Sequence, residues 1–174
     1  MRIVRSIWRD HEGSALAEGA VLVPVLIILL LGVYDFSWYF YQQHLIATGL
    51  RDAAHYLARS ANPSDATTQS DAKNLAVTGQ ITGGSARVPG WSTSNVQVAI
   101  SSDANSGSST PCGAVPCRGG ATIQLITVCT GTTSTTQSCS STSFSDPSFG
   151  IFGILGLTVP VFNVSHSERY IGPG

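Results

Sequence analysis

The feature that most constrains this chain is an uncharged apolar run in its first third. Residues 19–34 read GAVLVPVLIILLLGVY. As a helix this run is about 24 Å long, which is shorter than the roughly 30 Å hydrocarbon core of a bilayer. Extending the helix back to Ser14 closes the gap. The sequence therefore predicts one helix that crosses a membrane.

The charges that flank the run predict its orientation. Arg2, Arg5 and Arg9 precede it, and Asp35 follows it. The positive-inside rule places such an N-terminus in the cytoplasm and the chain from Asp35 onward across the membrane. A cleaved secretory signal would end in small residues, whereas residues 36–41 are bulky and mostly aromatic. We therefore expect the apolar run to be retained as a single-pass anchor.

One acidic residue stands at the start of this predicted span. The extension to Ser14 brings Glu18 to the edge of the membrane, where an ionised carboxylate is costly unless it has a partner. Two explanations are open. Glu18 either marks the helix start near the lipid headgroups, where an acid suits the helix N-terminus, or it pairs with a cation inside the membrane.

The residues around Glu18 resemble a type IV prepilin processing site. Residues 13–18 read GSALAE, with a glycine before the cut, a small residue after it and Glu fifth in the mature chain. The resemblance implies that a prepilin peptidase cleaves between Gly13 and Ser14. It also implies that the new amine of Ser14 meets the Glu18 carboxylate of a neighbouring subunit.

The resemblance continues beyond the processing site. Residues 32–36 read GVYDF, and residues 49–59 read GLRDAAHYLAR. Together with the proline in the apolar run, these motifs make residues 13–60 similar to the TadE-like family. Gly19 departs from the aromatic or apolar residue usual after the Glu. The assembly residues that the resemblance implies are Glu18, Pro24, Asp35 and Arg51.

This resemblance implies a minor pilin or pseudopilin of a Tad-type type IV pilus, acting in biogenesis, adhesion or secretion. The expected partners are the bacterial inner membrane, the prepilin peptidase, and other pilins or pilus assembly components. The expected location is the inner membrane, with a periplasmic C-terminal domain that is incorporated into the pilus. No cofactor and no metal site is expected. A formal net charge of −1 gives no basic field for nucleic acid.

The predicted fold is α+β and pilin-like, with a long helix that continues into a small antiparallel-sheet domain. We expect a basic leader at 1–13, a helix at 14–61 and a Ser/Thr/Gly-rich β domain at 62–174. Beyond the membrane the helix has an apolar stripe, including Leu50 and Leu57, that serves its own domain, other subunits, or each along a different length. Asn62-Pro63 is expected to end the helix.

Local patterns predict the elements of the β domain. A short helix is expected at 71–78. Alternation and β-branched residues predict strands at 95–100, 121–128 and 157–165. Small polar residues predict a loop at 101–109. The Gly-spaced apolar stretch at 149–157 is too short to span a bilayer and is expected to be a buried loop.

The cysteines predict disulfides. Cys112, Cys117, Cys129 and Cys139 all lie in the polar part of the chain, on the side expected to be oxidising. Four cysteines allow three pairings, of which we favour Cys112–Cys117 and Cys129–Cys139 because each closes a short loop. Zinc is the rival interpretation, but the sequence has no CxxC pair.

Catalytic motifs do not occur in the sequence. It has no GxSxG elbow, P-loop, HExxH or Rossmann glycine pattern, so we do not expect an enzyme. His44 and His55 are about 16 Å apart on a helix and are expected at a surface or interface. Two alternatives remain: a periplasmic binding module or enzyme tethered by an uncut helix, and an uncut TadE-like scaffold of the assembly machine.

Overall fold

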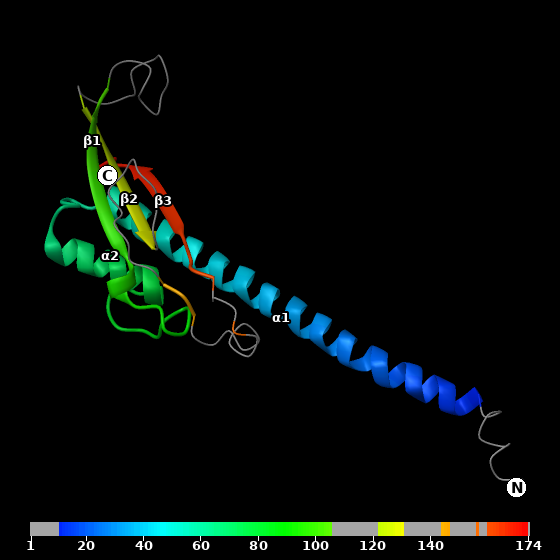
Figure 1. Cartoon of the computed structure of the whole chain (residues 1–174). Coiled ribbons are helices and arrows are strands. Elements are labelled where there is room, and N and C mark those ends of the chain that lie inside the picture. Colours follow the sequence, from blue (N-terminus) through cyan, green and yellow to red (C-terminus); the bar gives the residue numbers. More distant parts are fainter. Residues whose placement is uncertain (1–10, 106–121, 131–143, 147–155, 157–159, 174) are drawn as a thin grey trace, which may run out of the picture. The chain divides into compact units, whose positions relative to one another are not determined.

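The computed structural model describes residues 11–105, 122–130, 144–146, 156 and 160–173. Figure 1 shows a long helix and a small sheet with a second helix. The chain divides into two compact units, Met1–Tyr39 and Phe40–Gly174. The predicted α+β class is confirmed. The elements in chain order are α1 (His11–Ala58), α2 (Ala66–Thr78), the 3-10 helix η2 (Thr93–Asn95), β1 (Gln97–Ala104), β2 (Thr122–Thr130) and β3 (Val164–Arg169).

Helix α1 ends four residues before the predicted stop at Asn62-Pro63. Its last turn tightens, because the amide of Arg59 donates to Tyr56 O at 3.3 Å and that of Ser60 to Leu57 O at 3.2 Å. The carbonyl of Ala58 then accepts hydrogen bonds from the amides of Ile171 at 2.9 Å and Gly172 at 3.1 Å. A segment distant in sequence therefore provides hydrogen-bond donors for a backbone carbonyl at the end of α1.

Helix α2 begins five residues before the prediction. Asp65 caps it, since its carboxylate accepts from the amides of Thr67 and Thr68, each at 3.1 Å. At the other end Gly79 adopts a left-handed conformation, with φ of 80°, and its amide donates to Leu75 O at 2.9 Å. The sequence did not predict this start, because the threonine-rich first turn of α2 has no apolar periodicity.

The three strands form one antiparallel sheet in the order β1-β2-β3. The expected loop at 101–109 is wrong as far as Ala104, because Ser101 pairs with Leu125 and Ala104 with Thr122 in the ladder. Backbone pairing outweighs the polar composition of this segment. The third strand also lies later than expected, at Val164–Arg169, where pairing with β2 runs from Thr130↔Val164 to Leu125↔Arg169.

The core of the second unit forms where α1, α2 and the sheet meet. Helix α1 contributes Ile46, Leu50 and Leu57, and β2 contributes Ile126 and Val128, all fully buried. Further buried side chains come from α2 and from the segment between α2 and β1, namely Ala72, Ala76, Val88, Trp91 and Val96.

Two predictions about the β domain fall largely outside the described residues. Of the apolar stretch at 149–157 only Gly156 is described, so its burial stays a prediction. Cys112, Cys117 and Cys139 also lie outside that part of the chain. Cys129, near the end of β2, is fully buried and disulfide-bonded. The pairing among the four cysteines stays a prediction.

Candidate assembly helix

The described part of the first unit is a stretch of α1 that is largely apolar and exposed. From Val21 to Phe36 its large apolar residues keep 45–71% of their surface exposed. By length and composition, Ala17–Ala58 is a candidate membrane span. A helix that is apolar around its whole circumference requires lipid or other helices as its surroundings. The structure therefore supports the predicted single-pass membrane helix.

The residues of the predicted processing site lie in the first turns of α1. Gly13 and Ser14 fall within its helical backbone, and Glu18 lies one turn after Ser14 with an exposed side chain. Positions four apart share one face of a helix. Ser14 and Glu18 are therefore on the same face. Cleavage and the pairing of Glu18 remain predictions.

The other predicted assembly residues are spread along the helix. Pro24 lies inside α1 and leaves the carbonyl of Ala20 without its usual amide donor. Asp35 is buried, whereas Arg51 is exposed. Glu18 and Arg51 are separated by about nine helical turns. These residues therefore do not make one cluster, and any shared role must act along the length of α1.

Within the second unit α1 has two distinct faces. The predicted apolar stripe is buried, including Ile46, Leu50 and Leu57. The opposite face carries exposed polar residues, which are His44, Thr48, Arg51, His55 and Arg59. In this part of the helix the apolar stripe therefore serves the chain's own domain. Contact of another part of α1 with other subunits stays a prediction.

A buried polar contact on α1 was not predicted from the sequence. The side-chain amide of Gln42 donates to the carboxylate of Asp146, and both residues are almost completely buried. They are 104 positions apart. No local pattern indicates such a pair, since Gln42 stands in a polar YQQH stretch and Asp146 in a serine-rich segment. The contact connects the segment around Asp146 to α1 near the point where the helix enters the second unit.

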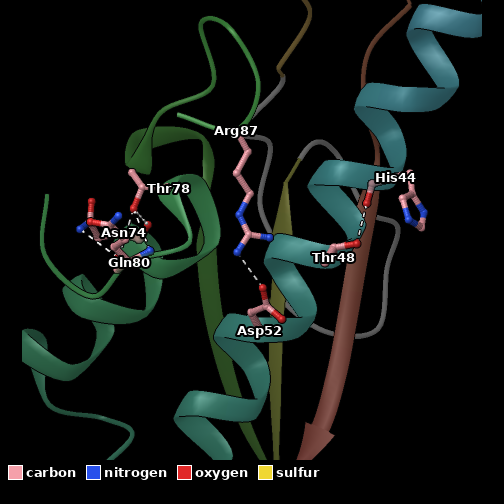
Figure 2. Close-up of polar contacts among 7 residues, drawn as sticks. All are labelled: His44, Thr48, Asp52, Asn74, Thr78, Gln80 and Arg87. Carbon is pink, nitrogen blue, oxygen red and sulfur yellow. Dashed lines mark hydrogen bonds and ion pairs between the residues drawn. The ribbon is translucent and has the colours of Figure 1, made fainter. Parts of the chain in front are cut away.

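Figure 2 shows a second polar link to α1. The guanidinium of Arg87 donates to the carboxylate of Asp52 at 2.7 Å, which ties the segment after α2 to α1. Beside it the amide of Asn74 donates to the carbonyls of Gln80, Ile81 and Gly83 at 2.9–3.2 Å. These contacts hold the turn after α2 against the helix pair. They fix the segment after α2 within the second unit.

The comparison with known proteins agrees with the location of the exposed helix. Residues 13–55 match the family model described as TadE-like protein. This is the family that the motifs of the N-terminal segment resemble. No curated protein and no solved structure matches the chain.

Proposed function

Because residues 13–55 form a TadE-like segment, we propose that this chain is a minor pilin or pseudopilin of a Tad-type pilus. It acts in pilus biogenesis, adhesion or secretion from the bacterial inner membrane. It crosses that membrane once, with residues 1–13 in the cytoplasm and residues 62–174 in the periplasm. The observation that carries the proposal is the exposed apolar length of α1 inside the matched segment.

The division of α1 supports assembly through its first half. In the second half of α1 the apolar stripe, including Ile46, Leu50 and Leu57, is buried in the chain's own domain. This stripe is therefore not available to other subunits. The first half exposes apolar side chains on all sides. In a bilayer that surface is covered by lipid, and in a filament it is covered by the helices of other subunits. The same residues therefore serve both the membrane and the assembled state.

In this proposal Glu18 favours assembly by forming a charge pair between neighbouring subunits. An ionised carboxylate among apolar helices is unfavourable unless an opposite charge meets it. Cleavage after Gly13 by the prepilin peptidase creates an amine on Ser14, on the same helical face as Glu18. A neighbouring subunit displaced along the helix axis offers that amine to Glu18. Subunits would then prefer a filament, where the charges pair, to isolated positions in lipid.

Pro24 and Asp35 have separate roles in the proposal. Pro24 removes one hydrogen bond from the membrane-embedded helix, which lowers the cost of local melting as a subunit leaves the bilayer. Asp35 follows the apolar run and marks the periplasmic end of the span. Arg51 stands on the exposed polar face of α1, available to other components of the assembly machine.

Intact-mass analysis of the protein extracted from membranes tests the processing step. A chain that lacks residues 1–13 and begins at Ser14 is the expected result. The same measurement in cells without the prepilin peptidase should give the full-length chain. A full-length chain in both cases would contradict processing and favour the uncut scaffold or the tethered periplasmic module.

Replacement of Glu18 tests the assembly step. We expect Glu18→Ala to leave membrane insertion unchanged and to reduce incorporation into sheared pili by at least tenfold, because the Ser14 amine of the neighbour loses its partner. The control is Asp103→Asn, which removes an exposed carboxylate from β1. Quantitative immunoblots of membrane and pilus fractions give both readouts. Normal incorporation of the Glu18→Ala protein would reject the charge pair.

A further inference from the structure

Two histidines and a glutamate meet between α1 and β3 in the second unit. His55 lies in the last turn of α1, and His166 and Glu168 lie on β3. One potential ligand atom from each residue falls within 4.8 Å of the other two. We propose that these three side chains bind a zinc ion. The site was not expected from the sequence, because His55 and His166 are far apart in the chain.

The sheet register explains how the two residues of β3 come together. His166 stands opposite Val128 and Glu168 opposite Ile126, and both β2 residues are fully buried. Directly opposed residues of an antiparallel pair point to the same face. His166 and Glu168, two positions apart, therefore share the face that carries the core. On that face they reach His55 of α1.

The distances among the three residues suit one small cation. Glu168 Oε1 lies 3.4 Å from His55 Nδ1 and 3.0 Å from His166 Nε2. Two ligands bound to zinc at 2.0–2.1 Å in tetrahedral geometry are roughly 3.4 Å apart. The imidazole rings are tilted by 54° with centroids 6.0 Å apart, so they are not stacked on each other.

The types of ligand favour zinc over magnesium or calcium. Two imidazoles and one carboxylate form a set that zinc sites use, whereas magnesium and calcium prefer oxygen ligands alone. The side chains of His55, His166 and Glu168 are 49%, 29% and 26% exposed, so an ion can reach them from solvent. Three protein ligands leave a fourth position for water or for a group from another molecule.

A pocket lies next to His55, which is the only one of the three proposed ligands that lines it. It has a volume of about 510 Å³ and is lined by His55, Asp52, Tyr56 and Arg59 of α1, together with Ser60, Ala61 and Thr68. Among these, Asp52 is held by Arg87. The pocket therefore gives water and ions access to His55.

Zinc at this position would connect the end of α1 to an edge strand. His55 is more than a hundred residues from His166 and Glu168, so the unfolded chain does not hold the three ligands together. An ion that binds only the folded chain stabilises it. The consequence is a metal-dependent stability of the second unit, which is separate from assembly through the first half of α1.

Thermal unfolding of the untagged full chain in detergent tests the proposal. Protein freed of metal with a chelator is compared with and without Zn²⁺, with Mg²⁺ as the control ion. At a Zn²⁺ concentration about a hundred times the Kd, we expect Tm to rise by roughly 5 °C or more. Mg²⁺ should leave Tm unchanged. Bound Co²⁺ should show the visible absorption of a four- or five-coordinate ion.

Variants separate a metal site from a simple polar cluster. His166→Ala and Glu168→Gln should each weaken Zn²⁺ binding at least tenfold in isothermal titration calorimetry and abolish the rise in Tm. The matched control is His44→Ala, since His44 is exposed on α1 and lies about 16 Å from His55 along the helix. It should respond to Zn²⁺ as the wild-type chain does.

Two results would overturn the proposal. The first is a rise in Tm with Zn²⁺ that is equal in the wild-type chain and in His166→Ala. The second is an unchanged Tm of the wild-type chain at millimolar Zn²⁺. If His166→Ala lowers the Tm of the metal-free protein, the three side chains also stabilise it by hydrogen bonds, and the Zn²⁺-dependent increment still decides the question.

Discussion

Gly49 is a glycine of α1 at which the fold leaves no room for a side chain. A Cβ built at this position overlaps the backbone oxygen of Ala76 and comes within 3.2 Å of Trp91 Cη2. The close approach of α1 and α2 therefore depends on the absence of a side chain. Gly32, on the same helix, meets no atom within 4 Å. The two glycines look alike in the sequence and differ only in their surroundings.

We expect Gly49→Ala to destabilise the protein by about 1–3 kcal/mol, because backbone atoms of α2 must move to accommodate the methyl group. Gly32→Ala is the matched control and should be neutral or slightly stabilising, since alanine is the better helix former. Denaturant unfolding in detergent, followed by tryptophan fluorescence, measures both. Equal stability of the two variants would show that α1 and α2 do not approach as closely as described.

Among the elements, α2 illustrates how side chains define a helix of weak apolar pattern. Its start is set by Asp65, whose carboxylate satisfies two amides of the first turn, and its end by Gly79. Only Ala72, Ala76 and Val77 are buried along its length. Small residues allow α2 to lie close to α1 but bury little apolar surface. The two caps therefore contribute a larger share of the stability of α2 than they would in a helix with a large apolar face.

We expect Asp65→Ala to lower the free energy of unfolding by about 1 kcal/mol, because the amides of Thr67 and Thr68 lose their acceptor. Asp65→Asn should recover most of the loss, since asparagine is also a good cap. The measurement is urea unfolding of the two variants beside the wild-type chain. A loss that asparagine does not recover would indicate a role for the charge beyond capping.

At the scale of the whole molecule, the two units require different surroundings. Met1–Tyr39 holds most of the exposed apolar side chains, whereas Phe40–Gly174 holds the buried core. The core of the second unit is made from its own residues, so this unit has a hydrophobic core of its own, as an independently folding domain requires. The predicted disulfides would add stability by restricting the unfolded chain.

We therefore expect a fragment of residues 40–174, produced under oxidising conditions, to fold in buffer without detergent. It should unfold cooperatively on heating, while the full chain should need detergent to remain in solution. Circular dichroism and analytical ultracentrifugation check these outcomes. A fragment that aggregates or melts without a cooperative transition would mean that the second unit depends on residues before Phe40.

Much of the fold was predictable because local signals were strong. The apolar run predicted the candidate membrane helix, and the stripe that includes Leu50 and Leu57 predicted which face of α1 is buried in the second unit. Its β-branched residues placed β2 within two residues. The weaker signals failed at the polar ends of elements, at Ser101–Ala104 of β1 and in the threonine-rich start of α2.

The sequence by itself determined the elements whose stability is local: a helix from its apolar period and a strand from its alternation. Only the tertiary structure decided which distant polar groups meet. Gln42 reaches Asp146, and His55 reaches His166 and Glu168, across separations of more than a hundred residues. The physical reason is that sheet register and helix packing, which involve the whole domain, set these contacts, and no local pattern encodes them.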